Sequence, residues 1–359
     1  MGAFMLDTTF NQQKAEAFSQ GLVEILNKSA VALAMSIGNR LGLFETMAKL
    51  PASTAEQIAG TAGLNERYVR EWLGTMVTGR VVNYFPESKT YQLPAEHAAF
   101  LTNEGEFNFA STMEFIPVLG NVEDKLIDCF RNGGGVPYTE YPRFHEVMAA
   151  ESDQTTVAAL DSHIIPLVPG LHEKLEAGIK VLDVGCGSGR AMIELAKRYP
   201  NSLFAGYDFS KESILRARSE ARKADVGNVR FEVRDAANIG ESAAYDLITS
   251  FDSIHDQADP AGMLASISKA LRSDGVYLVQ DIRGSCHIEK NLEHPLGPFV
   301  YTISLTHCMT VSLAYGGAGL GAMWGEETAI EMMTKAGFTS ITKNYLEHDF
   351  MNTYYVATK

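Results

Sequence analysis

The chain has 359 residues, 46% of them hydrophobic, so it can hold more than one domain and bury a substantial core. Its net charge of −14 and its lack of any basic run argue against a protein built to bind nucleic acid phosphates. Apolar runs stay short of the ~18 residues that cross a membrane, the longest being the mixed stretch SAVALAMSIG.

The first ten residues, MGAFMLDTTF, hold neither a basic region nor an apolar core, so we expect no secretory signal. Leu6 stands where a myristoylation site has Ser or Thr. Four scattered cysteines without zinc spacing indicate reduced thiols: Cys129, Cys186, Cys286 and Cys308. These features predict a cytoplasmic protein with no membrane partner.

The first part of the chain has the pattern of a winged helix. Thr54, with Ser53, and Asn65 can cap two short helices over residues 54–63 and 66–80. Residues 81–93, VVNYFPESKTYQL, read as a β-hairpin that turns at residues 86–89. Before them, apolar residues at helical steps predict one long amphipathic helix or two abutting ones: Phe18, Leu22, Ile25, Leu26, Leu33, Ile37, Leu41 and Phe44.

The helix over residues 66–80 would enter the major groove in a DNA-binding winged helix. It carries Arg67, Arg70 and Arg80, but Glu66 and Glu71 lie beside them. Residues 1–100 hold 8 Lys plus Arg against 9 Asp plus Glu. This helix is therefore a poor reader of a DNA groove.

A helical connector over residues 106–172 leads to VLDVGCGSG at residues 181–189, a buried strand followed by a glycine-rich turn into a helix. Glycines there let a ligand lie against the backbone and the amides of the helix start. Dinucleotide-binding proteins space their glycines G-x-G-x-x-G, whereas here Gly185, Gly187 and Gly189 alternate and Asp183 precedes them. A structural turn without a ligand is the alternative.

VLDVGCGSG resembles the first motif of the class I methyltransferases that use S-adenosylmethionine. In that family the glycine turn holds the amino-acid end of the cofactor. The resemblance implies an α/β, Rossmann-like, seven-stranded domain over residues 173–359.

Two later acids agree with this resemblance. The strands SLFAGYDFS and VRFEVRDAANI carry Asp208 and Asp235 at their carboxyl ends. The resemblance implies that Asp208 accepts both ribose hydroxyls and that Asp235 binds the adenine amino group. It assigns the cofactor site to Asp183, Gly185, Gly187, Gly189, Asp208, Phe209, Asp235, Ala236, Phe251 and Met148.

The N-terminal pattern is similar to the winged-helix domain of two-domain small-molecule O-methyltransferases, which pairs two subunits. The resemblance implies a 1–105 dimerisation domain and a homodimer. Within the connector, FHEVMAAES resembles the F-x-x-x-M helix that borders cofactor and acceptor in that family, matching Phe144 and Met148. Ordinary core packing at i, i+4 spacing is the alternative for these two residues.

IHDQADP, after a fourth strand over residues 245–250, resembles the H-D-W-S-D segment of plant and bacterial O-methyltransferases. His255, Asp256 and Asp259 match it, and the resemblance implies that His255 is the general base. A histidine suits this role because the sulfonium already activates the methyl group, so a near-neutral base is the main need. Gln257 stands where the family has tryptophan, which leaves one face of the adenine unassigned.

A helix over residues 263–272 and a fifth strand, GVYLVQDI, precede a long insertion at 283–325 that we expect to form a lid or pocket wall. The insertion also resembles a mycobacterial-type subgroup of two-domain methyltransferases. Cys286-His287 and His307-Cys308 allow a zinc site as an alternative, though without zinc spacing. We expect the acceptor pocket to be lined by Phe144, His145, Asp256, His294, Tyr301, His307 and Trp324.

After a helix over residues 326–338, a final antiparallel hairpin over 339–359 completes the expected sheet. The sequence therefore predicts methyl transfer from S-adenosylmethionine to a small molecule, on oxygen, without metal or nucleic acid. Transfer to sulfur or nitrogen is one alternative. A cofactor-binding winged-helix regulator is the other.

Overall fold

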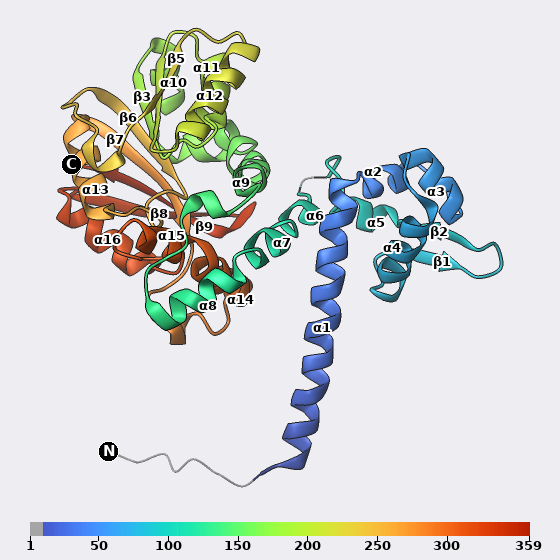
Figure 1. The fold of residues 1–359 in the computed structure, drawn as a ribbon. Coiled ribbons are helices and arrows are strands. Elements are labelled where there is room, and N and C mark those ends of the chain that lie inside the picture. Colours follow the sequence, from blue (N-terminus) through green and yellow to red (C-terminus); the bar gives the residue numbers. More distant parts are fainter. Residues whose placement is uncertain (1–9, 106) are drawn as a thin grey trace. The chain divides into compact units, whose positions relative to one another are not determined.

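The computed structural model describes residues 10–105 and 107–359 (Figure 1). The chain forms two compact units, Met1–Pro117 and Val118–Lys359. The predicted division at 105/106 and 172/173 stays a prediction. The expectations about a secretory signal and myristoylation fall on the first nine residues, which lie outside the described residues.

The first unit confirms the predicted winged-helix pattern. Thr54 caps α3 through a capping box with Gln57, and the Asn65 side chain accepts a hydrogen bond at the start of α4. The hairpin turns at residues 86–89, as predicted. The elements are α1 (Gln12–Arg40), α2 (Leu43–Ala48), α3 (Ala55–Ala62), α4 (Glu66–Thr78), β1 (Asn83–Phe85), β2 (Thr90–Gln92), α5 (Ala95–Ala98) and α6 (Phe109–Thr112), with α7 (Phe115–Gly120) crossing into the second unit.

The predicted pair of abutting helices is present as α1 and α2, but their apolar residues divide differently from the expectation. Phe44 is buried beneath Trp72, whereas Leu22 is 50% and Leu26 71% exposed. Several apolar residues of α1 are therefore exposed within the described part of the first unit, and we call them the apolar stripe of α1: Phe18, Leu22, Ile25, Leu26, Leu33 and Ile37. By length and composition alone, α1 also passes as a membrane span, with mean hydropathy 1.3 over 18 residues, contrary to the sequence expectation.

The second unit contains the predicted seven-stranded sheet, in the order β5-β4-β3-β6-β7-β9-β8. The first five strands in sequence are parallel, while β9 runs antiparallel between β7 and β8. The strands are β3 (Lys180–Val184), β4 (Leu203–Asp208), β5 (Val229–Val233), β6 (Tyr245–Phe251), β7 (Leu271–Ile282), β8 (Ser340–Leu346) and β9 (Asp349–Thr358). The strand order reverses at β3 and β6, where such sheets bind ligands.

Helices cover both faces of this sheet (Figure 1). Alternate strand residues serve the two faces: Val181 and Leu247 pack with α10, α11 and α12, whereas Leu182 and Ile248 pack with α13 and α16. These helices are α10 (Leu171–Ala177), α11 (Arg190–Arg198), α12 (Lys211–Lys223), α13 (Pro260–Ala270) and α16 (Gly325–Lys335). Burial on both faces explains the nearly continuous apolar strands of the sequence.

The structure corrects one detail of the predicted elements and describes the insertion. The predicted 263–272 helix ends at Ala270, because Leu271 is already extended and pairs with Tyr245 at the start of β7. The insertion folds into η6 (Ile288–Lys290), α14 (Gly297–Ile303), η7 (Ser304–Cys308) and α15 (Met309–Ala314), and its role as a lid or pocket wall stays a prediction. The connector is helical, as predicted, with α8 (Glu123–Asn132), η1 (Tyr138–Glu140), α9 (Phe144–Ser152), η2 (Asp153–Val157), η3 (Leu160–Ile164) and η4 (Ile165–Leu167).

Candidate functional site

The glycine turn after β3 is closely packed. Gly185 and Gly189 have φ of +78° and +73°, a region that residues with a side chain rarely adopt. A Cβ on Gly185 would lie 2.4 Å from the Cβ of Ser253, and one on Gly189 would lie 2.4 Å from the ring of Phe231. Only glycine therefore fits at these two positions of the turn.

Asp208, at the end of β4, is oriented by that turn. Its two carboxylate oxygens accept hydrogen bonds from the backbone N–H of Gly187, at 2.9 Å, and of Ser210, at 2.8 Å. Burial raises the pKa of Asp208 above its ordinary value, although these two N–H groups act in the opposite direction. Each oxygen keeps a further lone pair, so the carboxylate can accept two hydroxyl groups of a ligand.

The other predicted acids lie in different surroundings. Asp183 is buried and accepts a hydrogen bond from the Thr249 hydroxyl at 2.7 Å, and burial raises its pKa to about 7. Asp235 is exposed and caps the short helix η5 (Ala236–Asn238), accepting from the Ala237 N–H at 2.9 Å. Phe209 follows Asp208 and is 48% exposed. Asp208 ends β4, and Asp235 follows the end of β5. Both acids therefore lie at the carboxyl ends of neighbouring parallel strands.

His255 lies beyond β6 and is 5% exposed. Its Nδ1 donates to Oδ1 of Asp281, at 2.7 Å, and the indole N–H of Trp324 donates to the same oxygen at 3.0 Å. Burial opposes the charged imidazolium, but the Asp281 carboxylate and the adjacent Cys308 side chain outweigh it and raise the pKa of His255 well above its usual value. The pair has the arrangement of a base held by a carboxylate.

Sequence reasoning missed Asp281. It lies near the carboxyl end of β7, and the rule that selected Asp208 and Asp235, an acid at a strand end, would also have selected it. Trp324 was predicted to line the acceptor pocket, but its indole N–H supports Asp281. Phe251 ends β6, and Met148 is half-buried on α9.

A cluster of aromatic rings surrounds His307 at the end of the π-helical segment η7. The ring of Phe144 stacks on His307 with centroids 3.6 Å apart and planes 9° apart. Tyr138 and Tyr141 contact the same imidazole edge-on, at 5.1 and 4.9 Å. Phe144 and His307, predicted separately to line the acceptor pocket, are thus brought together.

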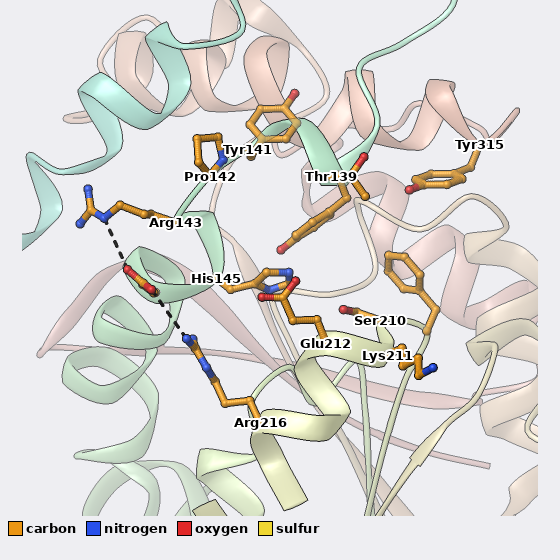
Figure 2. A pocket seen from close by; sticks show the side chains of 13 residues that line it. Thr139, Tyr141, Pro142, Arg143, His145, Ser210, Lys211, Glu212, Arg216 and Tyr315 are labelled. Carbon is orange, nitrogen blue, oxygen red and sulfur yellow. Dashed lines mark ion pairs between the residues drawn. The ribbon is translucent and has the colours of Figure 1, made fainter. Parts of the chain in front are cut away.

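Tyr138, Tyr141 and the predicted pocket residue His145 also line a cavity of about 400 Å³, together with Ser210 at the start of α12 (Figure 2). The rest of its wall comes from the start of α12 and from Tyr315. On one side Glu146 pairs with Arg143 and Arg216. The wall consists of Tyr138, Thr139, Tyr141, Pro142, Arg143, His145, Glu146, Phe209, Ser210, Lys211, Glu212, Arg216 and Tyr315.

Other predicted pocket residues have partners of their own. His294 accepts from the Leu296 N–H through Nδ1, and its Nε2 bonds the carbonyl of Arg283. The Tyr301 hydroxyl accepts from Asn291 at 3.0 Å. Burial raises the pKa of Asp256 to about 6. Their roles toward an acceptor stay predictions.

The zinc alternative finds no support in the described chain, where no three His, Cys, Asp or Glu side chains gather as a metal site. Cys286 is exposed, whereas Cys308 is buried beside His255.

Comparison with known families agrees with both units. Residues 29–103 match the family described as the Rv2258c-like winged HTH domain, and residues 175–312 match the family described as a methyltransferase domain. The chain therefore contains a methyltransferase domain. Its methyltransferase domain contains the glycine turn, Asp208, His255 and Asp281.

Curated methyltransferases match parts of this chain. The 27-O-demethylrifamycin SV methyltransferase of Amycolatopsis mediterranei is 32% identical over 30% of this chain and 40% of its own length. The O-methyltransferase cnsE of Penicillium expansum is 27% identical over 46% of this chain and 56% of its own. For the polyketide synthase ThaQ of Burkholderia thailandensis, 32% identical, the match covers 30% of this chain and 5% of that protein. The chain thus spans less than two thirds of these relatives.

Solved methyltransferase structures share the fold over nearly the whole chain. A candidate O-methyltransferase from Nostoc punctiforme has a TM-score of 0.72 at 22% identity, covering 96% of this chain and 98% of its own. Human N-acetylserotonin methyltransferase, solved with S-adenosylmethionine, has a TM-score of 0.70 at 16% identity, covering 99% of each chain. The residues here fit the same cofactor, because a Cβ added at Gly187 would meet nothing within 4 Å and the Asp208 carboxylate beside it keeps lone pairs that can accept hydroxyl groups.

Proposed function

We propose that this methyltransferase transfers a methyl group from S-adenosylmethionine to a hydroxyl group of a small molecule, with His255 as the general base. The pairing of His255 with Asp281 carries this proposal. The strands β3, β4, β6 and β7 are parallel, so their carboxyl ends lie on the same side of the sheet. The glycine turn, Asp208 and the His255–Asp281 pair all lie at these carboxyl ends.

The cofactor, when bound, supplies a methyl group activated by a sulfonium. The glycine turn and Asp208 would hold it, with Asp183, Asp235, Ala236, Phe209, Phe251 and Met148 as further candidates. Because Asp281 accepts the Nδ1 hydrogen of His255, Nε2 is the nitrogen that takes the proton of the acceptor. Orientation and proton removal are then the work of the protein.

The test is a calorimetric titration with S-adenosylmethionine and, separately, NADH, followed by a screen of phenols, catechols, thiols and amines for release of S-adenosylhomocysteine. Binding of S-adenosylmethionine alone with turnover on hydroxyl compounds supports the proposal. Binding of NADH alone would refute it.

Transfer to sulfur is the second candidate function. The side chain of Cys308 contacts His255, so the imidazole already accommodates a sulfur atom beside it. Turnover on thiols but not on hydroxyl compounds in the same screen would favour this candidate. Turnover on amines alone would favour transfer to nitrogen.

We further propose that two copies pair through the N-terminal unit and that the protein works in the cytoplasm. The exposed apolar stripe of α1 supports pairing, and four free cysteines support a reducing compartment. DNA binding is disfavoured, because Arg67 and Arg70 of α4 pair with Glu71 and Glu66. If the protein retarded duplex DNA in a gel in a salt-dependent way, the alternative of a cofactor-binding winged-helix regulator would be favoured again.

A further inference from the structure

His307 is a buried histidine for which the proposed reaction has no use. It is 2% exposed, and neither ring nitrogen has a hydrogen-bond partner in the part of the chain that the structure describes. An unpaired buried polar group costs about 1–3 kcal/mol of stability. Such a group in a native protein calls for an explanation, and a ligand that pairs with it is one.

The surroundings of His307 hold it in one orientation and keep it neutral. Phe144 stacks on one face of the ring, and the π-helical turn η7 carries the backbone. Burial, together with the nearby positive charge on His255 and His145, lowers the pKa of His307 well below its usual value. A neutral imidazole offers one N–H donor and one nitrogen acceptor, so it is complementary to a hydroxyl group.

His307 also adjoins the reacting groups. Cys308, the next residue, contacts His255, and His255 is close enough to act electrostatically on His307. The rings of Tyr138 and Tyr141 both contact His307 and both line the cavity, whose wall does not include His307 itself.

A ligand could reach His307 from the cavity only if one of the two tyrosine rings moved, and Tyr138 is the candidate. The Tyr141 hydroxyl donates to the carbonyl of Thr306 at 2.6 Å, which anchors that ring. Tyr138 follows a run of three glycines, of which Gly133 and Gly134 have φ of +73° and +85°. The carboxylates of Asp208 and Asp256 lie near Tyr138, and their charge disfavours an anionic ligand there.

We propose that His307 recognises the methyl acceptor by hydrogen bonding a hydroxyl or carbonyl group adjacent to the hydroxyl that His255 deprotonates, after the Tyr138 ring moves aside. This proposal rests on the proposed function. It defines the acceptor class as uncharged molecules with two neighbouring polar groups, of which catechol is the simplest probe. Phenol, which lacks the second group, is the matched comparison.

The first test is kinetic. In the wild-type enzyme, kcat/KM for catechol should exceed that for phenol by about 10-fold or more, because a site built to bind a polar group discriminates against ligands that lack it. In H307F the ratio should fall to about 2, the number of equivalent hydroxyls on catechol, with kcat on phenol changed less than about 3-fold. H163F, which alters the remote His163–His348 pair, is the control and should keep the wild-type ratio.

Thermal unfolding of the same variants separates recognition from a structural role. Removing two unpaired buried nitrogens should leave the Tm of H307F unchanged or raise it by about 2 °C. A structural role predicts a lower Tm and an unchanged catechol preference. H307L serves as a second variant where the larger ring disturbs packing.

Direct observation completes the test. In protein labelled with ¹⁵N-histidine and saturated with S-adenosylhomocysteine, catechol should shift the His307 ring signals, and phenol should leave them in place. The proposal is overturned if catechol does not shift the His307 ring signals. It is also overturned if H307F prefers catechol over phenol as strongly as the wild type does. Cofactor affinity is measured first in each variant, so failure of cofactor binding, which refutes the proposed function, is recognised separately.

Discussion

At the scale of the residue, the chemistry of His255 depends on its neighbours. Asp281 orients the imidazole and Trp324 orients Asp281. In H255A, turnover should fall by about 10² to 10⁴, the usual contribution of a general base, while cofactor affinity stays nearly the same. Steady-state kinetics on an identified acceptor and calorimetry measure the two effects. Full activity in H255A would remove the general-base role.

The raised pKa of His255 predicts a pH dependence. Below that pKa the imidazole is protonated and cannot accept a proton, so kcat should rise with pH through the neutral range and into the alkaline one. In D281N the carboxylate charge is lost, so the pKa of His255 falls and the rise moves to lower pH. The maximal kcat should also fall, by about 10² to 10⁴, because the imidazole tautomer is no longer held. If the pH profile of D281N matched that of the wild type, the pairing with Asp281 would not be the cause of the raised pKa of His255.

Asp208 is the residue on which cofactor affinity should depend most. In D208A, S-adenosylmethionine should bind about 1.5 to 3 kcal/mol more weakly, as expected when hydrogen bonds to a charged group are lost. Calorimetry measures this difference. Unchanged affinity would mean that the ribose hydroxyls do not lie at the end of β4.

At the scale of the element, the β3–α11 turn is the most constrained segment of the site. G185A should destabilise the protein by about 2–4 kcal/mol, because its Cβ would lie 2.4 Å from Ser253 and its φ is +78°. G187A is the matched control: its φ is +51°, but nothing lies within 4 Å of the added Cβ. It should cost only about 1–2 kcal/mol. Denaturant unfolding measures the free energy of unfolding of both variants. Equal losses in the two variants would show that the strain of a positive φ, and not the packing of the added Cβ, determines the cost.

At the scale of the whole molecule, the proposed pairing of two copies depends on the exposed stripe of α1. If two copies pair there, placing two charges in L22E/L26E should convert a dimer into a monomer in analytical ultracentrifugation. N27E, on the same helix, is the control and should stay a dimer. A wild-type monomer would refute pairing. If the wild-type protein instead bound lipid vesicles, the apolar residues of α1 would be assigned to membrane binding.

Much of this protein was predictable from local sequence because the determining interactions are local or periodic. Capping by Thr54 and Asn65, the hairpin at residues 86–89 and the apolar strands depend on neighbours within a few residues, and the structure confirms all of them. The glycine turn and the acid at the end of β4 have a readable spacing, since strand, turn and helix follow one another directly. Family comparison confirms the methyltransferase domain.

Only the tertiary structure decided which distant residues meet. Asp281 and Trp324 lie 26 and 69 positions beyond His255, and folding of the sheet and the insertion brings them together. The stack of Phe144 on His307 likewise joins the connector to the insertion, and no periodicity encodes that contact. The exposure of the α1 stripe was equally hidden, because an amphipathic pattern specifies an apolar face but not what covers it. Sequence determined the fold, the glycine turn and the candidate His255, whereas long-range packing determined the partners of His255 and the surroundings of His307.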